Sequence, residues 1–244
     1  MGMPITVEVL DREVRPRHLE AVFRLFRQAD ERFSPFKQTS ETSLWDRGLL
    51  KSSQISPQMR AVIQLAEETR QASEGYFDVY RDGRFNPVGI VKGWVIHKAA
   101  RLLQRAGFAD FYVEAGGDAQ VCGRGPGGKP WLVGIRNPFN VSQIIKVLEI
   151  GDSGVATSGT YFRGHHIYDP QNPAGRIAAE PVSLTVVAAD ILDADRFATA
   201  AFAMGRAGIA FIEGLDGCEG YIVDAAGTAT YTSGFAGYVA GANR

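Results

Sequence analysis

Ala194-Asp195-Arg196-Phe197-Ala198-Thr199-Ala200-Ala201 is the stretch from which the rest of the chain is best interpreted. It follows a strand-like apolar run at residues 182–188 and continues as an alanine-rich segment as far as Gly205. Alanine is the strongest helix former, and glycine commonly ends a helix. The pattern therefore predicts a helix from Ala194 to Met204.

Within that helix, Asp195 and Thr199 are one turn apart and share a face. A carboxylate and a hydroxyl so arranged can both bind a hard cation, and Mg²⁺ suits a sparse site because it keeps waters and takes further oxygens from phosphates. The structural alternative is that Asp195 interacts with the helix dipole and Thr199 fills the core. The pair alone favours this alternative, so the rest of the chain has to decide.

Periodicity elsewhere indicates a mixed fold. Apolar spacing predicts a helix from Arg17 to Phe33, and Ser56-Pro57 supplies an N-cap and a first-turn proline for a second that ends before Gly75. A third helix is expected at 94–106, strands at 5–10, 111–118, 131–136 and 144–150, and a closing hairpin at 220–231. Strands and helices do not alternate regularly, so we expect an α+β fold with an antiparallel sheet, helices packed on one face, and one compact domain over residues 1–244.

Composition excludes some classes of protein. The 244 residues are 45% hydrophobic and 22% charged, as in ordinary globular proteins. The net charge of −1 gives no support for a nucleic acid or an anionic membrane as partner. No apolar run approaches the roughly 20 residues that cross a bilayer. The first ten residues resemble no signal peptide, so we expect a cytoplasmic protein. Cys122 and Cys218 have no metal-binding spacing.

Two segments contain residue types of known active sites without the required pattern. Gly123-Arg-Gly-Pro-Gly-Gly-Lys-Pro130 is not GxxxxGK[ST], and a strand rather than a helix follows it, so we expect a hairpin turn. Ser158, His165 or His166, and Asp169 are the residue types of a hydrolase triad, but nothing local makes them converge. Histidines in a solvated loop are the simpler interpretation.

Two further segments carry charge beside glycine. Lys92 lies in Gly89-Ile-Val-Lys-Gly93, just before the helix predicted from residue 94. An ammonium beside helix N-terminal amides suits an anion such as phosphate, although a solvated lysine fits equally well. In Glu114-Ala-Gly-Gly-Asp118, the glycines permit a tight turn, and Asp118 is interpreted as a structural turn residue.

Taken together and in order, these segments resemble the ApbE family of FAD:protein FMN transferases. Four blocks carry the resemblance: Gly89-Ile-Val-Lys-Gly93; Glu114-Ala-Gly-Gly-Asp118 through Trp131-Leu-Val-Gly-Ile-Arg-Asn-Pro138; Ala156-Thr-Ser-Gly-Thr-Tyr161 with His166-Ile-Tyr-Asp-Pro170; and Ser183-Leu-Thr-Val-Val-Ala188 with Ala194-Asp195 and Thr199-Ala200. A single block has little specificity, but four in the same order are specific.

The resemblance implies the function and its residues. The family transfers the FMN part of FAD to a Ser or Thr hydroxyl of a flavoprotein partner and releases AMP. Mg²⁺ would be held by Asp195, Thr199 and the carbonyl of Gly89. The FAD pocket would be lined by Phe77, Asp78, Asn86, Lys92, Thr157, Ser158, His166 and Asp169. Lys92 would add positive charge at the pyrophosphate, and the general base would be Asp195 or His166.

The chain also departs from the family pattern. Asn86 and His97 stand where the family has aspartates, and the link from Asp78 to Asn86 is much shorter than in typical members. Members usually act outside the cytoplasm or carry a lipid anchor. Two alternatives therefore stay open: an FAD- or nucleotide-binding protein of the same fold without transfer, and a metal-dependent FAD pyrophosphatase.

Overall fold

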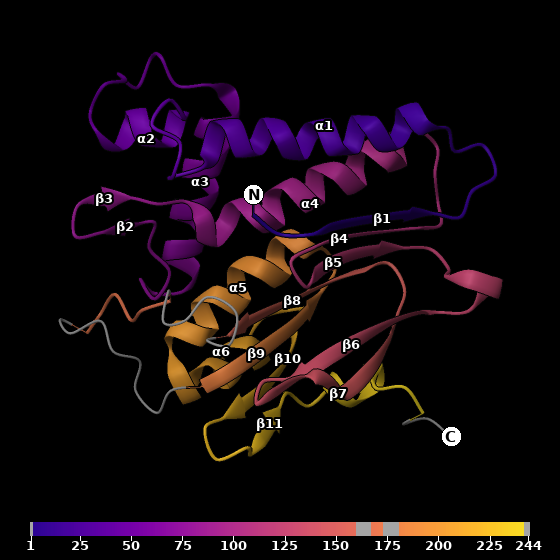
Figure 1. Ribbon diagram of the computed structural model, residues 1–244. Coiled ribbons are helices and arrows are strands. Elements are labelled where there is room, and N and C mark those ends of the chain that lie inside the picture. Colours follow the sequence, from indigo (N-terminus) through magenta and orange to yellow (C-terminus); the bar gives the residue numbers. More distant parts are fainter. Residues whose placement is uncertain (1, 160–166, 173–180, 242–244) are drawn as a thin grey trace.

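A seven-stranded antiparallel sheet forms the centre of the protein, and helices cover one of its faces (Figure 1). The computed structural model describes residues 2–159, 167–172 and 181–241. The strands follow the order β1 (Ile5–Val9), β4 (Phe111–Ala115), β5 (Asp118–Cys122), β8 (Ser153–Gly159), β9 (Pro181–Ala188), β10 (Glu219–Asp224) and β11 (Ala229–Tyr231). Every neighbouring pair is antiparallel. The predicted α+β class is confirmed.

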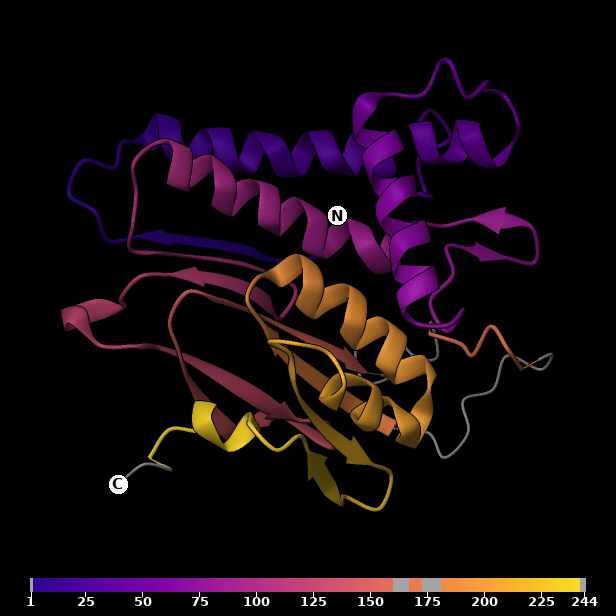
Figure 2. The same ribbon diagram turned by 180° about the vertical axis from the view of Figure 1, so that it is seen from behind.

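The helical layer contains α1 (Pro16–Phe33), α2 (Glu41–Asp46), α3 (Pro57–Ala72), α4 (Val88–Arg105), α5 (Ile191–Ala203) and α6 (Gly208–Glu213). Two of these helices, α4 and α5, contact both the sheet and each other. Helices α4 and α5 lie against the sheet and α1 lies outside α4, as both ribbon views agree (Figures 1 and 2). Fully buried side chains such as Phe26, Leu103 and Phe202 fill the space between these layers.

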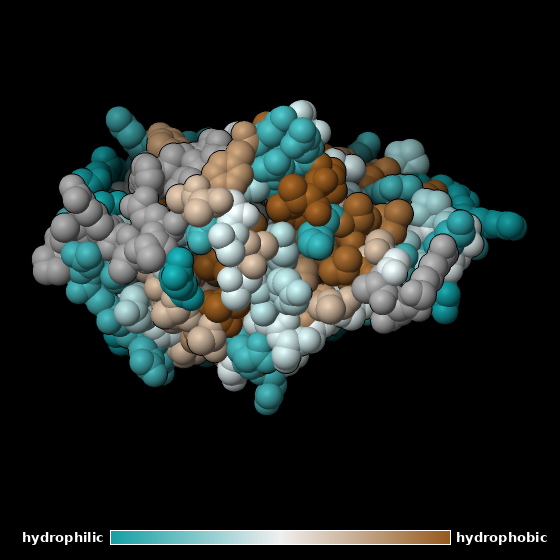
Figure 3. Space-filling view, turned by 90° about the horizontal axis from the view of Figure 1, so that it is seen from below, coloured by the Kyte–Doolittle hydropathy of each residue, from teal (hydrophilic) through white to brown (hydrophobic). Residues whose placement is uncertain are grey.

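A separate hairpin covers the opposite face of the sheet. It consists of β6 (Trp131–Asn137) and β7 (Asn140–Ile150), and it buries Trp131 and Leu148 against Val187 and Tyr221. The outer surface keeps exposed apolar side chains, and brown patches are visible on the face seen in Figure 3. The prediction of a hairpin turn at 123–130 is wrong, because β5 pairs with β4 and β8 whereas β6 pairs with β7.

Two helices begin earlier than the sequence pattern predicts. Helix α4 starts at Val88 rather than Trp94, and the side chain of Asn86 accepts the Val88 N–H at 3.1 Å. Helix α5 starts at Ile191 because Asp190 is its N-cap and accepts the N–H groups of residues 192 and 193 at 2.9 and 3.1 Å. Lys92 therefore lies inside a helix. Asp195 lies inside α5, more than one turn after the N-cap residue Asp190, so it does not cap the helix.

The short link between Asp78 and Asn86 folds as a small hairpin of β2 (Tyr80–Arg81) and β3 (Arg84–Phe85). It is fixed to α2 by an ion pair between Arg84 and Asp46 (2.8 Å). The indole N–H of Trp45 also donates to the Tyr80 hydroxyl at 3.3 Å. Among the described residues, no helix has the length and apolarity needed to cross a membrane.

Candidate functional site

Helices α4 and α5 approach each other closely at Gly93. A Cβ atom built on Gly93 would lie 2.7 Å from the Cβ of Asp195 and 2.9 Å from the backbone oxygen of Ile191. Only glycine fits at such distances, so the two helix backbones approach directly. The N–H of Gly93 donates to Oδ2 of Asp195 at 2.7 Å, which fixes this buried carboxylate between the helices.

Lys92 brings a positive charge to the same place. Its ammonium forms an ion pair with Oδ2 of Asp118 and lies 3.4 Å from Oδ1 of Asp195. Asp118 and Asp195 are 1% and 3% exposed. Burial is the largest cause that raises the pKa of Asp118 to about 7; the charge of Asp195 adds to the shift and Lys92 opposes it. The three groups together carry a formal charge of −1, which is costly in a buried site.

The oxygens predicted to hold a cation lie on facing turns of these helices. A Cβ on Gly89 would lie 3.5 Å from the side-chain methyl of Thr199 and 3.3 Å from the ring of Phe77, so the first turn of α4 lies against both residues. The Gly93 N–H, four residues after Gly89, donates to Asp195. A carbonyl oxygen has two lone pairs, so the Gly89 carbonyl is able to accept another ligand.

This oxygen-rich, negatively charged set fits a hard divalent cation. Carboxylate, hydroxyl and carbonyl oxygens are the ligands that Mg²⁺ takes in proteins. In the described part of the chain, no group of three or more His, Cys, Asp or Glu residues could hold a metal. A cation here would therefore have few protein ligands, with water and substrate supplying the rest.

Strand β8 and the segment 167–172 contain described residues that were predicted to form another wall of the FAD pocket. Thr157 donates its N–H to Oδ1 of Asp118 at 3.0 Å, so it adjoins the charged cluster, and Ser158 beside it is buried. The hydroxyl of Tyr168 donates to the Tyr80 carbonyl at 3.1 Å. This contact brings the segment that contains Asp169 to the loop that follows Phe77 and Asp78.

The remaining predicted residues are less closely connected with the cluster. His166 lies outside the described residues. Asn86 is exposed and its side chain accepts the first N–H of α4, while the Asp169 carboxylate accepts the N–H of residue 171. His97 faces Asp190, with 3.7 Å between Nδ1 and Oδ2, and burial lowers its pKa.

The sequence interpretation missed the role of Asp118. The Gly-Gly turn in front of it was visible, but that pattern gave only a structural reason for an aspartate. Asp118 is the first residue of a fully buried strand, and a buried carboxylate requires a hydrogen-bonding or charged partner. That requirement is the signal that could have indicated its role.

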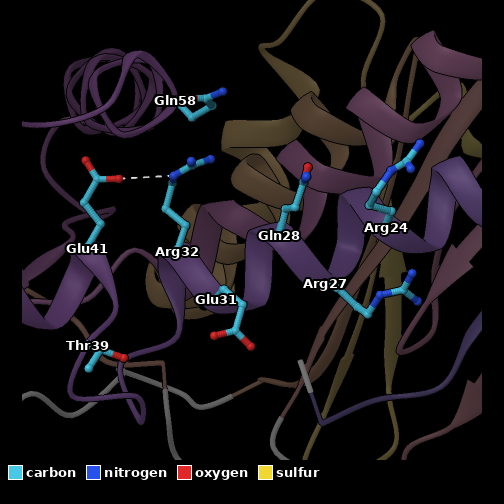
Figure 4. Close-up of a pocket in the computed structure, with 8 residues that line it drawn as sticks. All are labelled: Arg24, Arg27, Gln28, Glu31, Arg32, Thr39, Glu41 and Gln58. Atoms are coloured by element: carbon cyan, nitrogen blue, oxygen red, sulfur yellow. Dashed lines mark ion pairs between the residues drawn. The ribbon is translucent and has the colours of Figure 1, made fainter.

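A separate surface groove of about 620 Å³ lies along α1, and Arg32 and Glu41 form an ion pair across it at 3.2 Å (Figure 4). Arg24 and Arg27 also line this groove. None of the predicted site residues lines this groove, so the groove does not support the site proposed from the sequence.

Comparison with known proteins identifies relatives for most of the chain. The model of the ApbE family matches residues 1–83 and 81–222. An FAD:protein FMN transferase of Vibrio cholerae is 36% identical over 127 residues, which cover 48% of this chain and 37% of the relative. One from Salmonella typhimurium is 33% identical over 138 residues, which cover 52% and 38%. The chain thus spans well under half the length of these curated relatives.

Solved structures match over nearly the whole chain. The flavin transferase ApbE from Vibrio cholerae has a TM-score of 0.84 at 22% identity, covering 98% of this chain and 96% of that one. The ApbE protein from Thermotoga maritima has a TM-score of 0.85 at 22% identity, covering 97% and 96%. At this identity the likeness establishes the fold.

Proposed function

The chain belongs to the ApbE family, and we propose that it transfers the FMN portion of FAD to a Ser or Thr hydroxyl of a protein acceptor. The observation that carries this proposal is the meeting of Lys92 and Asp195 at the α4–α5 contact, with Gly89 and Thr199 on the adjoining turns. The names of the relatives agree with it.

We propose Asp195, Thr199 and the Gly89 carbonyl as the protein ligands of Mg²⁺. When bound, the cation would neutralise charge on the pyrophosphate and on the departing AMP. Phosphoryl transfer needs mainly positioning and charge stabilisation. The helix contact through Gly93 meets the first need, because it fixes Asp195 before any substrate arrives.

Lys92 is the second source of positive charge. Its ammonium is held in a largely buried position, where an electrostatic interaction with a phosphate oxygen is stronger than in water. The acceptor hydroxyl oxygen attacks the phosphorus on the FMN side, and the bond from that phosphorus to AMP breaks. Since Asp195 already accepts the Gly93 N–H, we propose His166 rather than Asp195 as the base that takes the hydroxyl proton.

We propose that Phe77, Asp78 and Asn86 line one wall of the FAD pocket. Thr157, Ser158, His166 and Asp169 would form the other wall. The small β2–β3 hairpin takes the place of the longer segment in typical members, so this side of the pocket depends on Tyr80 and its neighbours.

The test is mass spectrometry of an acceptor domain after incubation with the chain, FAD and Mg²⁺. We expect a mass gain equal to the FMN moiety, lost when the cation is chelated and lost in the Asp195→Asn variant. AMP released without any acceptor would identify an FAD pyrophosphatase instead. FAD that binds with neither a mass gain nor AMP would identify a binding protein.

A further inference from the structure

The Lys92 ammonium lies between the buried carboxylates of Asp118 and Asp195, and it is closer to Asp118. It is in direct ion-pair contact with Oδ2 of Asp118, whereas Oδ1 of Asp195 is 3.4 Å away. The Lys92 side chain is only 17% exposed, so it has little freedom to turn toward solvent. Both carboxylates therefore act on the position of the ammonium, and Asp118 is the nearer of the two.

Asp118 is held firmly from the sheet side. It is the first residue of β5, and its Oδ1 accepts the Thr157 N–H of the neighbouring strand at 3.0 Å. Gly116 and Gly117, with φ of 62° and 97°, make the turn that aims it there. Its Oδ2 is thereby left to face the lysine.

Asp195 has one oxygen already occupied. Oδ2 accepts the Gly93 N–H at 2.7 Å, so Oδ1, which lies 3.4 Å from the Lys92 ammonium, is the oxygen that would be available to a cation. A shift of the ammonium by a few tenths of an ångström would turn the 3.4 Å separation into a hydrogen-bonded ion pair. The ammonium and a cation would then compete for the same oxygen.

We propose that Asp118 is a positioning residue that holds the Lys92 ammonium on the sheet side and so keeps Oδ1 of Asp195 available to the divalent cation. This inference rests on the cation role in the proposed function. It assigns Asp118 a part in cation binding that acts entirely through Lys92.

The test is calorimetric titration of Mg²⁺ into the metal-free chain, without FAD or acceptor, for the wild type and Asp118→Asn. Asparagine keeps the shape and the oxygen that accepts the Thr157 N–H, but it removes the charge that holds Lys92. We expect Mg²⁺ to bind about 10- to 100-fold more weakly, the usual range for loss of a supporting group at a metal site.

The double variant Asp118→Asn/Lys92→Gln separates this role from a structural one. With no ammonium left to compete for Asp195, we expect the affinity for Mg²⁺ to return to near the wild-type value. A double variant as weak as the single one would overturn the inference, because a damaged fold is not repaired by removing a lysine. Near-ultraviolet circular dichroism checks that the variants fold.

The single variant Lys92→Gln keeps the inference falsifiable even if Asp118→Asn does not fold. Removing the competing ammonium should leave Mg²⁺ binding unchanged or tighter, and weaker binding would overturn the proposal. Wild-type affinity in a folded Asp118→Asn would overturn it while leaving the proposed function intact. A wild type that binds no Mg²⁺ would overturn both this inference and the cation site.

Discussion

Gly93→Ala is the substitution that tests most directly how the two helices build the site. The new methyl group would meet Asp195 Cβ at 2.7 Å, Asp195 Oδ2 at 2.9 Å and the Ile191 oxygen at 2.9 Å. One of these contacts is with backbone, so rotation of a side chain cannot relieve all three. Helix α4 has to move away from α5, and the hydrogen bond from Gly93 to Asp195 has to lengthen or break.

The expected cost follows from opposing effects. Overpacking costs about 1–3 kcal/mol, and a weakened hydrogen bond to a charged group adds about 1 kcal/mol. Alanine recovers about 1 kcal/mol because it is a better helix former than glycine. The net loss is therefore about 2 kcal/mol, which lowers the melting temperature by roughly 4–8 °C in a chain of this size.

The assay combines thermal unfolding with Mg²⁺ titration. We expect Gly93→Ala to melt lower and to bind Mg²⁺ about 10- to 100-fold more weakly, since the carboxylate loses its support. Gly220→Ala is the matched control, because its Cβ would crowd side-chain atoms of Ile209 and Ile212 at 3.1 Å and none of the three nearest atoms belongs to the site. It should lose stability without losing Mg²⁺ affinity. If Gly93→Ala melted at or above the wild type with unchanged affinity, the helix contact would not be what holds Asp195.

Three further outcomes are expected. Asp195→Asn should abolish transfer and weaken Mg²⁺ binding, but its melting temperature should stay near that of the wild type because the amide oxygen still accepts the Gly93 N–H. Asp195→Ala should melt at a distinctly lower temperature. Equal melting temperatures of the two variants would contradict the role of that hydrogen bond. The pKa of Asp118 is raised to about 7 from 3.8, so its contribution to stability is fully present below about pH 4 and is lost as the pH rises through about 7. Denaturant titrations from pH 4 to 8 should therefore show the metal-free wild type losing stability relative to Asp118→Asn, and parallel curves would refute this. Cys122 and Cys218 are buried and their pKa values are raised to about 11 by burial; a thiol reagent at pH 8 should modify them only after unfolding, and rapid modification of the native chain would contradict the packing.

Amphipathic helices with clear ends were predictable from the sequence. The helix predicted from Ser56-Pro57 is α3, and the Ser56 hydroxyl accepts the Met59 N–H at 3.1 Å. The helix predicted to start at Arg17 begins one position earlier, at Pro16. The apolar spacing of both helices and the capping serine of α3 are local features, so no tertiary information was needed.

The start of α4 was not predictable in the same way, because Gly89 and Gly93 suggest a loop. A side chain at Gly93 would meet the Ile191 backbone and Asp195, and one at Gly89 would meet the side chains of Phe77 and Thr199. A sequence does not reveal these neighbours. Asp190 is different. An aspartate immediately before an apolar run is a recognisable N-cap, and recognising it would have placed Asp195 inside α5 rather than at its start.

Strand pairing was the least predictable feature. Strands β5 and β6 follow each other along the chain but belong to different sheets, and β5 pairs instead with β8. The pairing matters for the site because Asp118 on β5 is bound by Thr157 on β8. The burial of Asp195, which is 3% exposed, was not predictable from the sequence either. Burial of a charge depends on which elements close over it.

The charges at the α4–α5 contact support a cation independently of any resemblance. Among the described residues, two buried carboxylates and one ammonium leave one negative charge, and a buried net charge is costly in a protein. A proton on Asp118 is one way to remove that charge, and its raised pKa is the sign of it. A divalent cation beside Asp195 is the other. It would favour the ionised form of Asp118, and an ionised Asp118 holds Lys92 more strongly. Cation binding at Asp195 and retention of Lys92 by Asp118 would therefore reinforce each other, so we expect the two carboxylates to act as one unit.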